Sequence, residues 1–88
     1  MVTGGTGLIG SCIVRDLVRE GEHVVVYDIL PERSFLERLM SEDAIERMVK
    51  IVRGDVTDLP YLFRTIRENR IEKIIHTASL LTLESNSN

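Results

Sequence analysis

Apolar residues along the chain follow two spacings, one typical of helices and one typical of buried strands. Residues 11–20 are predicted to form a helix, because apolar positions recur there at three-to-four spacing, as on one buried helix face. These positions are Ile9, Ile13, Leu17 and Val18. Residues 23–28 are a β-branched run without clear alternation, which is typical of a parallel strand covered by helices on both faces. This part of the chain therefore alternates helix and strand.

The later segments continue the alternation. Residues 49–53 are predicted to be a third strand, residues 59–70 a helix, and residues 73–76 a fourth strand. With a short first strand at residues 1–3, four strands alternate with helices, which indicates the α/β fold class. Right-handed crossovers predict one parallel sheet with strands three, two, one and four side by side.

The segment between the second and third strands is predicted to hold two short helical pieces. Residues 32–40 suit a helix with one core face, and a separate turn follows, capped by Ser41. The apolar residues of that face are Phe35, Leu36, Leu39 and Met40. These side chains are predicted to belong to the core and to contact no ligand.

Glycines at positions 4, 7 and 10 lie between the first strand and the first predicted helix, where a phosphate-binding turn would lie. Gly4 permits a tight chain reversal, Gly7 lets the backbone approach a pyrophosphate at positive φ, and Gly10 lets the helix pack closely against a strand. The N–H groups and the dipole of the helix would then face the phosphates. The other interpretation is a plain glycine-rich turn that binds no ligand, and the choice between the two depends on the downstream residues.

Asp28 ends the second strand, 24 positions after Gly4. A carboxylate at this place accepts hydrogen bonds from both ribose hydroxyls of an adenosine, and its charge repels a 2′-phosphate. NAD is therefore favoured over NADP, although Asp28 also suits a turn before Pro31. Arg33 keeps two readings open: contact with a 2′-phosphate if the loop folds back, or a solvated charge at a helix start.

Four motifs follow one another along the chain: the glycine turn, Asp28, the run from Gly54 to Asp58 and the run from Ile74 to Ser79. Together they resemble the N-terminal half of an extended short-chain dehydrogenase/reductase, the group of NAD-dependent nucleotide-sugar epimerases and dehydratases. The resemblance covers nearly the whole chain. It implies a Rossmann-type parallel sheet, NAD as cofactor, and a nucleotide sugar or related polyol as substrate, and it leaves a homodimer open.

The resemblance also implies roles for particular residues. The backbone of Leu8 and Ile9 would lie over the pyrophosphate, and Asp28 would bind the adenosine ribose. Asp55 and Val56 would flank the adenine. The residues along the nicotinamide side would be Thr77, Ala78 and Ser79.

Three later polar residues have roles that follow from their positions alone. Asp55 stands where the chain turns at the carboxyl edge of the sheet, so it is predicted to accept a hydrogen bond from the adenine amino group. Asp58 precedes Leu59 and Pro60 and is predicted to cap the helix there. For His76 a packing or hydrogen-bonding role is favoured over catalysis or metal binding, because no second histidine or cysteine stands at ligand spacing.

The general acid/base pair of the family, Tyr-x-x-x-Lys, is absent from this sequence: Pro31 stands four residues after Tyr27, and Thr65 four residues after Tyr61. Residues 1–88 are therefore expected to be a truncated Rossmann-type sheet, a partial NAD(P)-binding domain without the C-terminal substrate-binding part. Alone, the chain is expected to be marginally stable and without turnover. A non-catalytic NAD(P)-binding regulatory module, or an inactive truncated gene product, is the alternative.

Composition narrows the choice of partners. The net charge is −3 and no basic stripe occurs, which argues against nucleic acid and anionic membranes as partners. Apolar runs are shorter than the roughly 20 residues of a membrane helix, and no hydrophobic leader precedes the glycines. The expected compartment is the cytoplasm. Cys12 is the only cysteine, so no internal disulfide can form.

Overall fold

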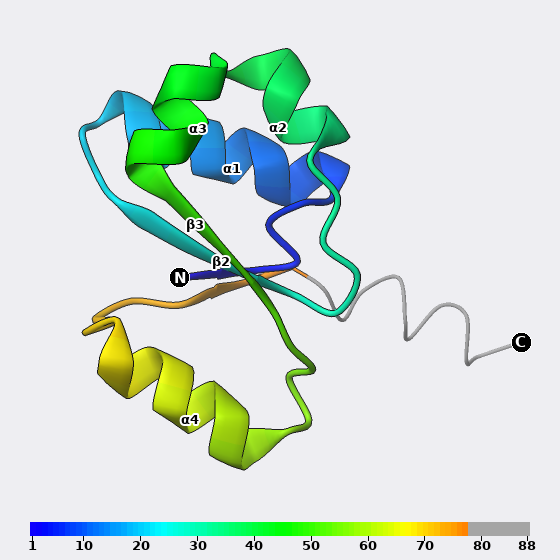
Figure 1. Cartoon of the computed structure of the whole chain (residues 1–88), viewed down its shortest axis with the longest axis vertical. Helices are drawn as coiled ribbons and strands as arrows, with labels where there is room; N and C mark the ends of the chain where they lie inside the picture. The colour runs from blue at the N-terminus through cyan, green and yellow to red at the C-terminus, as the bar shows by residue number, and fades with distance from the viewer. Residues whose placement is uncertain (78–88) are drawn as a thin grey trace, which may run out of the picture.

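The computed structural model describes residues 1–77, which form four strands and four helices (Figure 1). In chain order the elements are β1 (Val2–Thr3), α1 (Leu8–Arg19), β2 (Val24–Asp28), α2 (Ser34–Leu39), α3 (Glu42–Met48), β3 (Val49–Arg53), α4 (Leu59–Glu68) and β4 (Ile75–His76). Neighbouring strands pair in parallel, and the order across the sheet is β3-β2-β1-β4. The predicted fold class and strand order are therefore confirmed.

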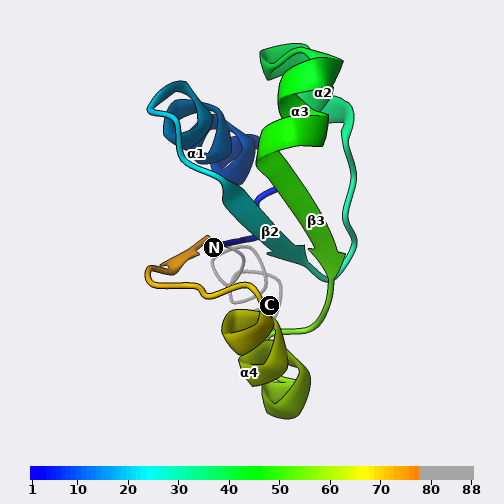
Figure 2. The same ribbon diagram turned by 60° about the vertical axis from the view of Figure 1, so that its left-hand side comes forward.

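Helices cover both faces of this sheet. α1, α2 and α3 lie on one face, and α4 lies on the other (Figure 1, Figure 2). The chain passes from β1 to β2 and β3 in one direction, and then returns past β1 to reach β4. Because crossovers between parallel strands are right-handed, this reversal of direction places α4 on the opposite face.

The hydrophobic core lies on the side of the sheet that α1, α2 and α3 cover. Its buried members are Val2, Val14, Val24, Val26, Leu36 and Ile45. The predicted buried face of the first helix is wrong at one position, since Ile9 is 66% exposed while Val14 is fully buried. α1 begins as early as Leu8, so its first turn lies at the carboxyl edge of the sheet, beyond the strands. The other predicted positions do pack against the core: Ile13, Leu17 and Val18.

The two central strands of the order differ greatly in length. β2 pairs with β3 over five positions, whereas β1 pairs with each of its neighbours over two. The fourth strand, predicted over residues 73–76, is therefore limited to Ile75–His76. A parallel ladder can extend only where a partner strand runs alongside, and β1 offers only Val2 and Thr3.

Side-chain caps mark the starts of two helices. Ser41 Oγ accepts a hydrogen bond from the Ala44 N–H at 3.1 Å, at the beginning of α3. Asp58 Oδ1 accepts one from the Tyr61 N–H at 3.3 Å, at the beginning of α4. Such bonds satisfy N–H groups that have no partner inside the helix. Both predicted caps are confirmed.

α2 is shorter than the helix predicted for its segment. The helix predicted over residues 32–40 is the six-residue α2, because Met40 has the extended backbone angles φ −140° and ψ 155° and separates α2 from α3. Of the core face predicted for it, Leu36 is fully buried. None of the helices within residues 1–77 has the length and apolar character needed to cross a membrane.

Candidate functional site

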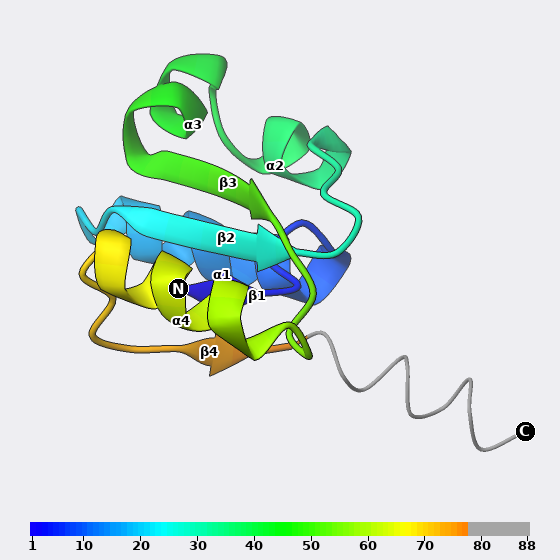
Figure 3. The same cartoon turned by 60° about the horizontal axis from the view of Figure 1, so that its bottom comes forward.

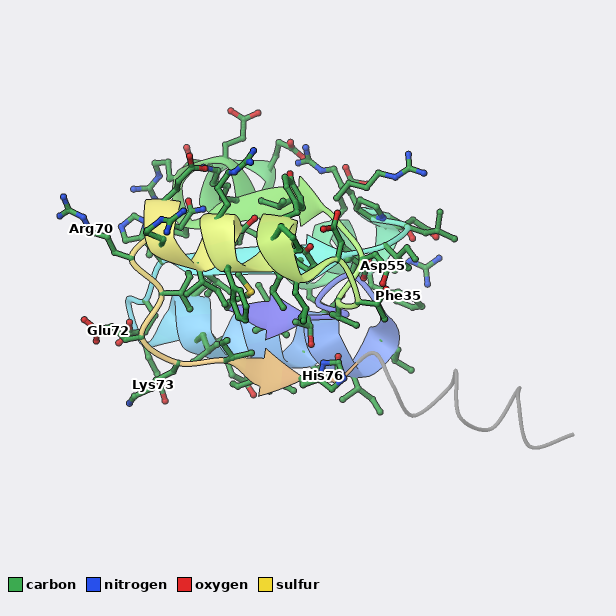
Figure 4. The ribbon with its side chains drawn as sticks, turned by 90° about the horizontal axis from the view of Figure 1, so that it is seen from below. Phe35, Asp55, Arg70, Glu72, Lys73 and His76 are labelled. Carbon is green, nitrogen blue, oxygen red and sulfur yellow. The ribbon has the colours of Figure 1, made fainter. Side chains whose placement is uncertain are left out.

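The predicted site residues gather at one edge of the sheet. All strands are parallel, so their carboxyl ends meet there (Figure 3). The glycine turn follows β1, Asp28 ends β2, Asp55 follows β3 and Thr77 follows β4. Figure 4 shows Asp55 and His76 at this edge and Lys73 at the opposite one.

The strand order contains one switch point at this edge. β1 leads into α1 on one face of the sheet, whereas β4 is reached from α4 on the other face. Open α/β sheets bind ligands in the crevice outside such a point, where neighbouring strands connect in opposite directions. The glycine turn and Thr77 flank this position, so the fold itself indicates where a ligand would lie.

The glycine turn reverses the chain at Gly4, whose φ is +71°. The Gly4 N–H donates to the Tyr27 carbonyl at 2.9 Å, and the Gly7 N–H donates back to the Gly4 carbonyl at 3.1 Å. Gly7 caps α1 with φ −72° and ψ 177°, so the expected positive φ at Gly7 is wrong. Only Gly4 needs the left-handed region here, because the reversal occurs at that residue.

Two further glycines in this segment permit close packing. A Cβ on Gly10 would lie 2.2 Å from the Gly4 carbonyl oxygen, so α1 packs tightly against the glycine turn, where the prediction named a strand. A Cβ on Gly5 would lie 2.8 Å from Val26 Cγ1 in β2. Gly5 was not predicted as important, although the doubled glycine was a visible signal.

The start of α1 supplies backbone donors at the edge. The first N–H groups of a helix have no partner within it, and the Gly7 cap contributes no side-chain acceptor. Leu8 and Ile9, in this first turn, are 60% and 66% exposed. An anion at this position would meet free donors and the positive end of the helix dipole.

Asp28 is bonded directly to the glycine turn. Its Oδ2 accepts the Thr6 hydroxyl at 2.6 Å and the Thr6 N–H at 3.3 Å, while its Oδ1 accepts the Leu30 N–H at 3.2 Å. The carboxylate is half-buried and stays joined to the turn after β1. Thr6 was missed by sequence reasoning, although a hydroxyl residue between the glycines was the available clue.

Arg33 lies at the start of α2 and faces glutamates. Its Nη2 lies 2.5 Å from Glu42 Oε1, and its Nε lies 3.9 Å from Glu37 Oε2. Glu37 belongs to α2, and Glu42 belongs to α3. This arrangement favours the reading of Arg33 as a partly solvated charge at a helix start.

Asp55 forms a small hydrogen-bonded turn after β3. Its Oδ1 accepts the Thr57 N–H at 2.9 Å and the Thr57 hydroxyl at 2.7 Å. These two donors stabilise the charged form and hold the pKa of the Asp55 carboxyl below its usual value. Val56, between them, is half-buried.

Tyr27 ties this turn to the sheet and was not predicted to do so. Its ring is fully buried, and its hydroxyl donates to the Asp55 carbonyl at 3.0 Å. Burial raises the pKa of Tyr27, and the nearby carboxylates and Tyr61 raise it further. A Cβ on Gly54 would lie 2.3 Å from Tyr27 Cζ, so only glycine leaves room for the ring.

The chain after β4 is held by β1. The N–H and the hydroxyl of Thr77 both donate to the Thr3 carbonyl, at 3.1 and 2.6 Å. Thr3 Oγ1 lies at hydrogen-bond distance from His76 Nδ1, which confirms the interpretation of His76 as a hydrogen-bonding residue. Residues 1–77 contain no group of side chains suited to hold a metal ion. The predicted nicotinamide-side residues Ala78 and Ser79 lie outside the described residues.

A hollow of about 780 Å³ lies at the opposite edge of the sheet. Its lining includes the amino ends of β2, β3 and β4, at Val24, Val49 and Ile75. None of the predicted site residues lines it. The hollow is therefore separate from the candidate site, which lies at the carboxyl edge with the glycine turn and the carboxylates.

A parallel sheet with a glycine turn after β1 and an acidic residue at the end of β2 defines the class of Rossmann-type, dinucleotide-binding folds. A family model described as GDP-mannose 4,6 dehydratase matches residues 1–85 of the chain. The chain therefore belongs to the NAD-dependent epimerase/dehydratase family of extended short-chain dehydrogenases/reductases.

Individual relatives agree with this assignment. UDP-glucose 4-epimerases from Neisseria meningitidis serogroup B and Haemophilus influenzae are 42% and 40% identical to the chain over 82 residues. Each alignment covers 91% of this chain and 24% of the relative. The crystal structure of UDP-glucose-4-epimerase from Stenotrophomonas maltophila, with bound NAD and formylated UDP-arabinopyranose, matches with a TM-score of 0.74 and 32% identity. That match covers 88% of this chain and 23% of the other, so the chain spans about a quarter of the length of these relatives.

Proposed function

We propose that this chain binds NAD at the carboxyl edge of its sheet, as the cofactor-binding part of an epimerase or dehydratase acting on a nucleotide sugar or related polyol. The observation that carries the proposal is the contact between Asp28 and Thr6, which joins the acidic residue to the glycine turn. These are the two elements that a dinucleotide-binding edge requires, one for the ribose and one for the pyrophosphate. The NAD bound in the Stenotrophomonas maltophila structure supports the same cofactor.

The first proposed roles belong to the glycine turn and the start of α1, at the carboxyl edge of the sheet. The pyrophosphate would lie at the start of α1, against Gly7 and the backbone of Leu8 and Ile9, with Gly4 and Gly10 shaping the turn. Gly7 is exposed, and the nearest atom that a Cβ there would meet is the Gly4 oxygen at 3.5 Å, which supports an open approach to this backbone.

The remaining roles lie on either side of the pyrophosphate. Asp28 would accept the ribose hydroxyls, and Asp55 and Val56 would flank the adenine. Thr77 would lie on the nicotinamide side, together with Ala78 and Ser79. When bound, NAD supplies a hydride acceptor for oxidation of a substrate carbon.

NAD is proposed over NADP for two reasons. The Asp28 carboxylate repels a 2′-phosphate at the ribose that it would bind. Arg33, the cation considered for such a phosphate, is engaged with Glu37 and Glu42. The charge of Asp28 thus disfavours NADP directly, and the pairing of Arg33 with glutamates leaves this cation less available to a 2′-phosphate.

Binding without turnover is proposed for these 88 residues alone. The sequence contains no Tyr-x-x-x-Lys pair. Tyr27 cannot serve instead as a base, because it is buried and its pKa is raised. A non-catalytic NAD(P)-binding module is the second candidate function, because none of the contacts proposed for NAD at this edge involves a catalytic residue. A Tyr-x-x-x-Lys pair in a longer protein that contains these residues would favour the enzyme.

Calorimetry with NAD and NADP tests the proposal. The wild-type chain is expected to bind NAD at least about tenfold more tightly than NADP, a difference of about 1.4 kcal/mol. Asp28→Asn keeps the size of the side chain and removes its charge, so the preference should largely disappear. Asp43→Asn, at an exposed aspartate on α3, is the matched control and should keep it. Equal affinity for both cofactors in the wild type would contradict the assignment.

A further inference from the structure

The contact between Thr6 and Asp28 joins two residues that are 22 positions apart in the chain. Thr6 is 4% exposed, whereas Asp28 is half-buried at the end of β2. A buried donor therefore holds one oxygen of a carboxylate that remains open to a ligand. This geometry is suited to orienting the carboxylate.

The three hydrogen bonds to Asp28 differ in strength. The Thr6 hydroxyl lies 2.6 Å from Oδ2, within the short range typical of a hydroxyl that donates to a charged oxygen. The backbone N–H groups of Thr6 and Leu30 lie 3.3 and 3.2 Å from the carboxylate, at the long end of the range for amides. The hydroxyl is therefore the principal anchor of the side chain.

A carboxylate offers about four acceptor positions, and three donors already use it. A ribose presents two hydroxyl donors, so at least one existing bond must yield when both bind. The two long backbone bonds are the weaker ones and would be replaced first. The Thr6 hydroxyl would then hold Oδ2 while the ribose is bound.

The hydroxyl is not needed to join the glycine turn to β2. The Gly4 N–H already donates to the Tyr27 carbonyl at 2.9 Å, and Gly5 packs against Val26. The first contact is a backbone hydrogen bond, and the second is the close packing of a glycine that has no Cβ. Neither depends on the Thr6 side chain, so both persist when the hydroxyl is removed. Loss of the hydroxyl should therefore affect Asp28 more than it affects the fold.

We propose that Thr6 is a positioning residue that holds the Asp28 carboxylate for ribose recognition, and that it thereby sets part of the preference for NAD over NADP. The proposal rests on the proposed function of this edge. Without the hydroxyl only the two long backbone bonds hold the Asp28 carboxylate, so its terminal torsion is less restrained and binding must order a more mobile side chain. A carboxylate that can turn away also repels a 2′-phosphate less.

The test compares four versions of the 88-residue chain by calorimetry with NAD and NADP. Thr6→Val has nearly the same shape and lacks the donor, so the ratio of NAD to NADP affinity should fall about fivefold. Thr6→Ser keeps the donor and should retain the wild-type ratio. Thr65→Val is the matched control, because Thr65 is also 4% exposed and its hydroxyl donates to the Tyr61 carbonyl within α4.

Circular dichroism must show each variant folded, and Thr6→Ala replaces Thr6→Val if the latter is not. A folded Thr6→Val or Thr6→Ala chain with the wild-type ratio would overturn the role of Thr6 alone. An equal fall in Thr65→Val would overturn it too, since the effect would then be general. Absence of any preference in the wild type would overturn both this inference and the proposed function.

Discussion

The two faces of the sheet differ in how completely they are packed. On the side of α1, α2 and α3, the helices contribute Val14, Leu36 and Ile45 to the core, each at most 2% exposed. On the other side, the only buried residue of α4 is Thr65, and Phe63 is 59% exposed. Within residues 1–77, the core cluster and the side chains packed on it come from positions up to Ile51. The apolar core of the described chain is thus built almost entirely on one face.

The candidate site draws on both of these regions. The glycine turn and Asp28 connect β1, α1 and β2, which surround the packed core. Asp55 and Val56 lead into α4, and this turn is tied to the sheet by the hydroxyl and ring of Tyr27 and by the Gly54 N–H, which donates to the Asp28 carbonyl at 3.0 Å. We infer that the proposed pyrophosphate and ribose contacts rest on the firmer part, whereas the proposed adenine contacts depend on a few local bonds.

The largest expected effect is a difference in the free energy of unfolding between a substitution on the packed face of the sheet and one on the face that α4 covers. Leu36→Ala removes a fully buried side chain and should cost about 2–5 kcal/mol of the free energy of unfolding. Leu59→Ala, at a residue of α4 that is 51% exposed, should change it by less than about 0.5 kcal/mol. Urea unfolding followed by circular dichroism measures both. Similar losses for the two leucines would contradict the contrast between the faces.

A smaller effect is expected where Tyr27 meets Gly54. Gly54→Ala places a Cβ against the ring and should cost about 1–3 kcal/mol. Tyr27→Leu removes the ring atoms that the Cβ meets, so the two changes should partly compensate. A double-mutant cycle in urea should give a coupling of about 1 kcal/mol or more in favour of the double variant. Strict additivity would mean that ring and turn are independent, and that α4 is held by other contacts.

The smallest effect concerns the charge at the Asp55 turn. Thr57→Val removes one of the two donors that lower the pKa of the Asp55 carboxyl, so this pKa should rise toward its ordinary value. A carbon-detected NMR titration of Asp55 measures the change, and Thr57→Ser should keep the wild-type pKa. Because the pKa of Asp55 is lower in the folded than in the unfolded chain, the ionised carboxylate stabilises the fold at pH values above the unfolded pKa of about 3.9. This stabilisation is lost as the pH falls through the folded pKa. An unchanged pKa in Thr57→Val would show that the backbone N–H acts alone.

Much of the fold was predictable because local rules act within a few residues. The caps at Ser41 and Asp58 follow from side chains that bond to N–H groups three positions ahead. The bounds of β3 agree with the predicted strand, Val49–Arg53. The burial of individual residues was less predictable. Ile9 has the right spacing for the core face and is exposed, because burial depends on which strand lies beneath a helix turn.

The sequence by itself determined the order of the elements, the parallel sheet, and the presence of glycines and an aspartate at strand ends. Spacing and backbone preferences carry this information, and both are properties of short segments. Only the tertiary structure decided that Gly4 takes the positive φ, that Thr6 holds Asp28, and that Tyr27 occupies the space left by Gly54. The two side-chain contacts join residues more than twenty positions apart, and the turn at Gly4 is closed by a bond from its own N–H to β2. Such contacts exist only once the strands lie side by side.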